Sequence, residues 1–143
     1  MAPRRRATYG AAVSREIIHS YYAAFNAGDW EGMVALLADD VVHDLNQGPR
    51  ERGKDAFRQF LARMERCYRE RLEDIVILEG PPGRMAAEWV VHGEYLADDA
   101  GLPPAHGQRY TLPGGAFFAL DDDDRITRVT NHYNLQAGLA QIR

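Results

Sequence analysis

Cysteine is almost absent from the chain, since Cys67 is the only one among 143 residues. A single thiol excludes an internal disulfide and a cysteine framework for a metal, so we expect a reducing compartment, the cytoplasm. Long apolar runs are also missing, because no segment approaches the roughly 18 residues that span a bilayer. The basic start, MAPRRRATYG, is followed by no hydrophobic stretch, which argues against secretion.

An excess of one charge is missing too. Lysine and arginine number 17 against 21 aspartates and glutamates, a formal net charge of −4, so nothing favours a nucleic-acid partner. No membrane partner is expected either. The arginines at 4–6 could belong to a transit peptide or contact an anionic partner, but we expect residues 1–10 to form a disordered basic arm. Residues 11–143 then form a single domain around one core.

The first half of the chain has the apolar spacing of helices. Apolar residues recur every three or four positions across residues 13–25, which predicts an amphipathic helix that ends at Gly28. Asp29 is suited to cap a shorter second helix. A third helix is predicted from residue 54 to about residue 71, and residues 41–46 predict a strand before it.

The second half changes to an apolar period of two, which is typical of strands. Strands are predicted over residues 74–78, 85–96, about 108–120 and 126–135, with turns at 80–83, 98–104 and 121–124. Helices followed by long strands predict the α+β class, with three N-terminal helices packed in the concave face of a strongly curved, mostly antiparallel sheet.

Polar residues on the first predicted strand raise the question of what that strand faces. Because side chains alternate along a strand, His43 is predicted to point inward, and Asp44 outward unless a β-bulge changes the phase. Asn131 is a polar group on the apolar face of the last predicted strand. Together with the hydroxyl of Tyr21 or Tyr22, these groups indicate a small-molecule site in an aromatic pocket.

Apolar residues on the same inward faces complete the predicted pocket. Its expected substrate-binding wall consists of Phe25, Phe57, Leu61, Trp89, Val91, Tyr95, Ala116, Phe118 and Tyr133. No metal site is predicted, because His92 and His132 have the opposite strand parity from the pocket residues and no tight ligand spacing occurs. The glycines at 80, 83, 114 and 115 do not match a phosphate loop, so no cofactor is expected.

Three segments resemble the nuclear transport factor 2-like superfamily, in particular its ketosteroid isomerase-related and SnoaL-like branch. They are YYAAFNAGDWEGMVALLADDVVHD at 21–44, RERGKDAFRQFL at 50–61 and GGAFFALDDDDRITRVTNHYNL at 114–135, and the similarity spans about residues 12–138. The resemblance implies a cone-shaped, cystatin-like roll, a fold that carries isomerases, cyclases, epoxide hydrolases, dehydratases and proteins without catalysis. It also implies a homodimer, formed through the outer sheet face with Val90, His92, Phe117 and Thr130.

Ketosteroid isomerases pair an aspartate base with an oxyanion hole made of a tyrosine and a protonated aspartic acid. The resemblance places this tyrosine at Tyr21. The base falls near Asp44, although a gap-free match puts Leu45 at its place. The oxyanion aspartic acid falls on Ala116, so one transition-state donor of this enzyme class is missing.

Limonene epoxide hydrolase is similar over the same segments. Its water-positioning tyrosine and asparagine fall on His43 and Leu45. Its catalytic aspartate, arginine and aspartate fall on Val91, Trp89 and Asn131, so the charged residues of that enzyme are absent. What remains at these pocket positions is a different polar set, His43 and Asn131.

Two functions are compatible with these residues. The first is a cofactor-independent enzyme of the isomerase or lyase type that moves a proton on a hydrophobic, carbonyl-bearing small molecule. Asp44 or His43 would transfer the proton, and Tyr21 and Asn131 would hold the developing enolate oxygen. The alternative is a non-catalytic, dimeric module of the same fold that binds a small ligand.

Overall fold

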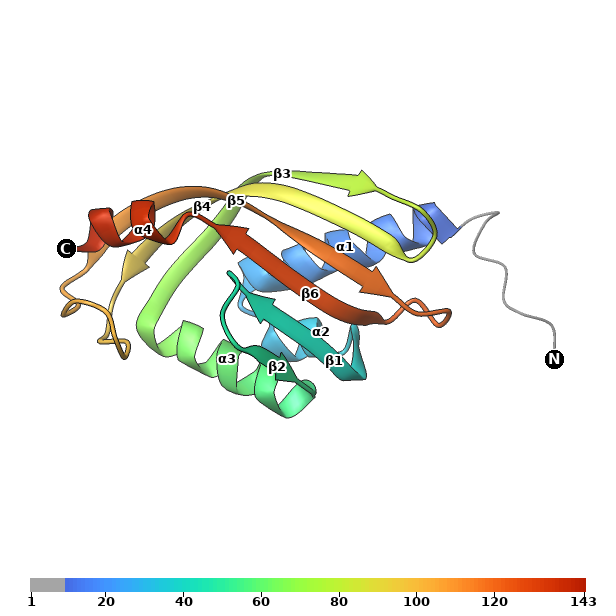
Figure 1. The fold of residues 1–143 in the computed structure, drawn as a ribbon, viewed down its shortest axis with the longest axis horizontal. Coiled ribbons are helices and arrows are strands. Elements are labelled where there is room, and N and C mark those ends of the chain that lie inside the picture. The colour runs from blue at the N-terminus through green and yellow to red at the C-terminus, as the bar shows by residue number, and fades with distance from the viewer. Residues whose placement is uncertain (1–9) are drawn as a thin grey trace.

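The computed structural model describes residues 10–143 as four helices and one curved sheet (Figure 1). The elements are α1 (Gly10–Ala27), α2 (Trp30–Val34), β1 (Leu37–Leu45), β2 (Arg50–Arg52), α3 (Lys54–Cys67), β3 (Tyr68–Glu79), β4 (Arg84–Tyr95), β5 (Gln108–Leu120), β6 (Ile126–Tyr133) and α4 (Leu135–Ile142). The basic arm predicted at residues 1–10 lies outside the described residues, except for Gly10 at the start of α1.

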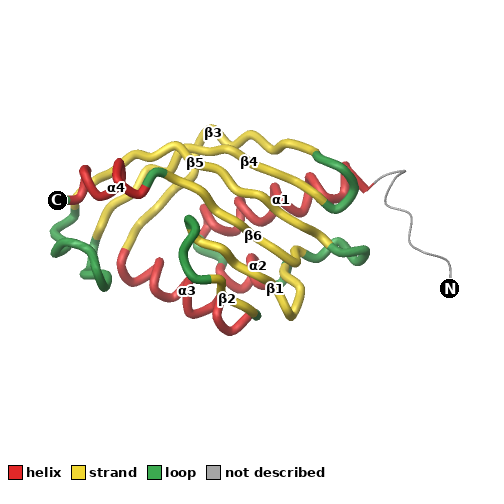
Figure 2. The backbone as a smooth tube through the Cα atoms, viewed as in Figure 1, coloured by secondary structure: helices red, strands yellow, loops and turns green. Residues whose placement is uncertain are grey.

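The sheet has the strand order β2-β1-β6-β5-β4-β3. All neighbouring strands are antiparallel apart from β1 and β6, which run parallel. Figures 1 and 2 show α1 under the arch of β3, β4 and β5, with α2 behind β1 in this view and α3 beside β2. The predicted α+β class and the curved, mostly antiparallel sheet over three N-terminal helices are confirmed.

Helix α1 buries one stripe against the sheet, as its apolar spacing predicts. Ile18, Tyr21 and Tyr22 are among its buried residues. The Asn26 side chain fixes the end of the helix to β3: its Nδ2 donates to the Leu72 carbonyl, and its Oδ1 accepts from the Leu72 N–H, both at 2.9 Å. Gly28 then adopts a φ of +68°, which favours glycine, and the chain leaves the helix there.

Strand parity in the long hairpin is as the sequence predicts. In β4 the odd-numbered residues are buried and the even-numbered ones are more exposed, while in β5 the even-numbered residues face the core.

The Asp29 side chain accepts a hydrogen bond from the Gly32 N–H at 2.9 Å, so the predicted N-cap of α2 is also confirmed.

The predicted boundary between α3 and β3 is wrong. The helix ends at Cys67, not near residue 71, and β3 begins at Tyr68, not at residue 74. The charged residues after Tyr68 favour a helix locally, but pairing of the segment with β4, from Tyr68 opposite Tyr95 onward, overrides that preference. This shift brings Glu70 onto the inner face of the sheet, between Tyr68 and Leu72.

Two short elements were not predicted from the sequence. Strand β2 pairs with β1 and places Arg50 opposite Asp44. Strand β6 ends at Tyr133, whereas the sequence predicts a strand to residue 135. Helix α4 follows it, and the Asn134 side chain caps this helix by accepting a hydrogen bond from the Ala137 N–H at 3.0 Å. Among the described residues, no helix is long and apolar enough to cross a membrane.

Replacing Asn26 by alanine is expected to destabilise the fold by about 1–3 kcal/mol, because the buried Leu72 peptide would lose both partners. The free energy of unfolding in denaturant measures this effect. The matched control is His19→Ala on an exposed position of the same helix, which should change stability by less than about 0.5 kcal/mol. Equal effects of the two substitutions would contradict the structural role of Asn26.

Candidate functional site

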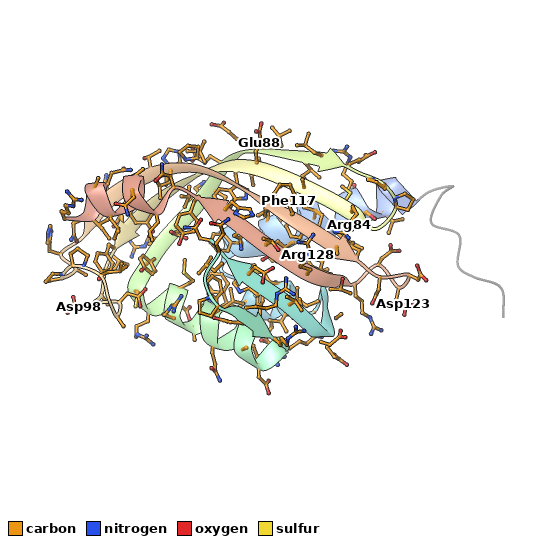
Figure 3. All side chains as sticks on the ribbon, viewed as in Figure 1. Arg84, Glu88, Asp98, Phe117, Asp123 and Arg128 are labelled. Carbon is orange, nitrogen blue, oxygen red and sulfur yellow. The ribbon has the colours of Figure 1, made fainter. Side chains whose placement is uncertain are left out.

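A cavity of about 660 Å³ lies between the helices and the inner face of the sheet. This volume is within the usual range of small-molecule sites. Seven of the predicted pocket residues line it, namely Tyr21, Tyr22, Phe25, Trp89, Val91, Asn131 and Tyr133. The loop between β4 and β5, on which Figure 3 labels Asp98, lines one part of the cavity, and α4 contributes apolar residues to its wall.

Five other predicted wall residues do not line this cavity. Phe57, Leu61, Ala116 and Phe118 are buried in the core of the domain. Tyr95 is also fully buried, and its hydroxyl holds the β4–β5 loop, because it donates to the Pro103 carbonyl at 2.6 Å and accepts from the Asp99 N–H at 2.9 Å. The apolar spacing of the helix and the inward parity of the strands predict burial for these residues, but they pack within the hydrophobic core and leave no cavity surface.

Asp44 points away from the cavity and does not line it. Its carboxylate accepts two hydrogen bonds from Arg50, at 2.7 and 3.0 Å, and one from the Thr130 hydroxyl at 2.8 Å. The Arg50 hydrogen bond is the main reason why the pKa of Asp44 is lowered. No bulge turns the end of β1 inward, and the unpredicted strand β2 supplies the arginine, so the arrangement does not suit Asp44 to act as a base inside the cavity.

His43 is buried as predicted, but it lies behind the cavity wall. Its ring packs against Phe57 and Phe60 with centroid distances of 5.0 and 4.6 Å. Its Nε2 lies 3.2 Å from the amide nitrogen of Asn131, which lines the cavity. Burial lowers the pKa of His43 to about 4, so the imidazole is neutral at neutral pH.

Two acid–phenol pairs line the end of the cavity near the β4–β5 loop. The Tyr110 hydroxyl donates a short hydrogen bond to Glu70, and the Tyr68 hydroxyl donates to Asp99 at 2.6 Å. Burial raises the pKa of Glu70, and the Tyr110 hydrogen bond offsets part of that rise. The pKa values of Tyr68 and Tyr110 are raised by burial and by the neighbouring carboxyls, so both phenols keep their protons.

Gly93 makes the contact between Tyr110 and Glu70 possible. On adjacent strands, Glu70 is paired with Gly93, and Gly93 is paired with Tyr110. The Tyr110 ring crosses the middle strand directly over Gly93, where an added Cβ would lie 2.1 Å from the ring carbon Cζ. Only glycine leaves room for a phenol to reach a carboxyl two strands away.

Arg63 from α3 contributes a positive charge to the cavity wall. Its Nε is buried, has no hydrogen-bond partner within residues 10–143, and lies 3.9 Å from an Asp99 oxygen. Its guanidinium lies 5.8 Å from the centre of the Phe60 ring. Burial raises the pKa of Tyr21 well above its ordinary value, so this wall residue also remains a neutral phenol.

Glu70 and its partners are the site residues that the sequence analysis missed. The signal was present, because Tyr68, Glu70 and Leu72 alternate with the exposed Arg69 and Arg71. The same segment also fits the end of the predicted third helix, so the sequence favours a helix where the structure has β3. Within the described part of the chain, no group of three histidine, cysteine, aspartate or glutamate side chains is arranged to hold a metal ion.

A SnoaL-like domain model matches residues 18–129. The chain belongs to the SnoaL-like family. A solved structure of a candidate polyketide cyclase from Xanthomonas campestris pv. campestris is 55% identical, covers 93% of this chain and 98% of its own, and has a TM-score of 0.89. Another, from Pseudomonas putida KT2440, is 53% identical with a TM-score of 0.88 and covers 91% of this chain and 98% of its own. No curated protein matches the chain.

More distant neighbours share the fold alone. TerC co-crystallised with polyporic acid is 19% identical, with a TM-score of 0.76 and coverage of 90% of this chain and 97% of its own. An LEH-like epoxide hydrolase from M. tuberculosis is 16% identical, with a TM-score of 0.71 and coverage of 93% and 91%. The resemblance to the SnoaL-like branch of the NTF2-like fold is thereby confirmed.

His43 should make the stability of the protein depend on pH. Its folded-state pKa of about 4 lies below the unfolded value of 6.5, so the unfolded state binds the proton more readily and stability falls as the pH drops from 6.5 to 4. The loss amounts to about 3 kcal/mol at most. In denaturant titrations, His43→Phe should remove this part of the pH dependence, and a variant with the full wild-type slope would contradict the assignment.

Tyr110→Phe should raise the pKa of Glu70 further, because the carboxylate would lose its hydrogen bond while its burial is unchanged. Gly93→Ala should act in the same direction, since the added methyl displaces the Tyr110 ring. Carbon NMR titration of the Glu70 carboxyl measures both shifts. The control is Tyr133→Phe, which changes a phenol of the same cavity that donates no hydrogen bond to Glu70.

Proposed function

We propose that the protein is an acid–base enzyme that transfers a proton, without a cofactor, on a hydrophobic, carbonyl-bearing small molecule in an isomerase- or cyclase-type reaction. The observation that carries this proposal is the Glu70 carboxyl, which faces the cavity, has a raised pKa and accepts a hydrogen bond from Tyr110. A carboxylate with a raised pKa is a stronger base than an ordinary glutamate at the same pH. Glu70 therefore takes the role that the sequence analysis gave to Asp44 or His43.

The proton transfer follows from this arrangement. The Glu70 carboxylate removes a proton from the carbon next to the substrate carbonyl, and the electron pair of the broken C–H bond moves into an enolate. The Asn131 side chain stabilises the enolate oxygen from the cavity wall. Protonated Glu70 then returns the proton to another carbon of the same molecule, which isomerises it, or to the oxygen formed when the enolate attacks a second carbonyl and closes a ring.

The family supports the cyclase-type form of this reaction. The two solved relatives that are 55% and 53% identical are named candidate polyketide cyclases. A ketosteroid isomerase is not supported, because Ala116 occupies the position of the oxyanion aspartic acid and is buried in the core. The apolar side chains of Phe25, Trp89 and Val91 line the cavity and favour a hydrophobic substrate.

Glu70→Gln should lower the rate of proton transfer by about 10²–10⁴-fold, because the amide cannot accept the proton. The rate of hydrogen–deuterium exchange at the carbon next to the carbonyl of α-tetralone measures this step by NMR and needs no natural substrate. The matched control is Glu88→Gln on the outer face of β4 (Figure 3), which should leave the rate unchanged. Wild-type exchange no faster than the buffer background would contradict the proposal.

The alternative function is a non-catalytic, dimeric module that binds a small ligand, and the missing oxyanion aspartic acid is the observation in its favour. A bound ketone would then raise the melting temperature with increasing concentration while no exchange occurs. The homodimer through the outer sheet face remains a prediction for either function. Phe117 supports it, since 52% of this residue is exposed on that face (Figure 3) and its ring packs on His132.

A further inference from the structure

The contact between His43 and Asn131 links a buried ring to the cavity wall. His43 Nε2 lies 3.2 Å from the Asn131 amide, whereas its other ring nitrogen, Nδ1, is buried and has no hydrogen-bond partner among the described residues. Asn131 itself lines the cavity. The one hydrogen-bond partner of the ring among the described residues is therefore a group that lines the cavity.

The position of the single ring proton decides which end of the Asn131 amide faces the ligand. A neutral imidazole donates from one nitrogen and accepts at the other, and the two ends of an amide are equal in size. With the proton on Nδ1, Nε2 would accept from the amide nitrogen, and Oδ1 would point toward the cavity. With the proton on Nε2, the amide turns over, Oδ1 receives the hydrogen bond, and the NH₂ group points toward the cavity.

The surroundings of the ring favour the proton on Nε2. Phe57 and Phe60 pack against His43, and neither offers an acceptor oxygen. A buried N–H without a partner is rarer in proteins than a buried acceptor without one. The charges that act on the ring from a distance are Asp44 and Arg63, and they oppose each other.

We propose that His43 is a positioning residue: it donates its Nε2 proton to Asn131 Oδ1 and so presents the Asn131 NH₂ group to the cavity as a hydrogen-bond donor. The ligand then places an acceptor, a carbonyl or enolate oxygen, against Asn131. A hydroxyl donor at the same position is disfavoured. This inference rests on the proposed function, because it names the chemical group that the same cavity binds.

Long-range proton–nitrogen NMR on isotope-labelled protein at neutral pH tests the tautomer without any turnover. The expected result is one histidine with its proton on Nε2 whose signals disappear in His43→Phe. If that variant does not fold, the signals of the other four histidines are assigned with His19→Gln, His92→Gln, His106→Gln and His132→Gln, which leaves His43 by elimination. A proton on Nδ1, or on both nitrogens, would overturn the proposal.

Binding of a matched ligand pair tests the consequence for Asn131. The ketone α-tetralone should bind about tenfold more tightly than the hydrocarbon tetralin, which has nearly the same shape but no acceptor. Asn131→Leu and His43→Phe should both abolish this preference. His43→Gln should restore it, because a glutamine amide can donate from nearly the same place as Nε2.

The results separate this inference from the proposed function. A ketone preference that survives in His43→Phe would overturn the positioning role, even if proton exchange by Glu70 is fast. Conversely, an Nε2 proton and a ketone preference without any exchange would uphold the role of His43 and contradict only the catalytic proposal.

Discussion

The pairing of β3, β4 and β5 is the constraint on which the polar end of the cavity depends. Glu70, Gly93 and Tyr110 lie side by side on these three strands, and the absent side chain in the middle lets the outer two meet. A shift of β3 by one residue would turn Glu70 to the outer face and bring an exposed arginine inward. The raised pKa of Glu70, its hydrogen bond and its access to the cavity thus share one structural cause.

Two carboxyl groups in this protein show how the environment sets their chemistry. Asp44 lies on the outer side of β1, where Arg50 and Thr130 hold it as a carboxylate with a lowered pKa. Glu70 lies on the inner side of β3, where burial raises its pKa and only a neutral phenol compensates. The Asp44 carboxylate joins β1 to its two neighbouring strands through Arg50 and Thr130. The Glu70 carboxyl is suited to exchange a proton with a bound molecule.

Asn131, with His43 behind it, is a further polar position in the cavity wall. The histidine is packed between phenylalanine rings, and its low pKa keeps it neutral, so it stabilises an orientation without placing a charge near the ligand. Two polar groups of the cavity wall each have a neighbour within hydrogen-bond distance: Tyr110 for Glu70, and His43 for Asn131. Sites with few, fixed polar groups in an apolar wall select ligands by the position of their own polar atoms.

The sequence by itself determined the fold class, the strand parity of β4 and β5, the cap of α2, the burial of His43 and the family, because these follow from periodicity and local motifs. The tertiary structure decided where α3 ends, which carboxyl faces the cavity and which inward residues lie in the core instead of lining the cavity. Local preference favours a helix beyond Cys67, and only the long-range pairing of β3 with β4 makes that segment a strand. Glu70 enters the site for the same reason, since the register that places it beside Gly93 and Tyr110 involves residues distant in the chain.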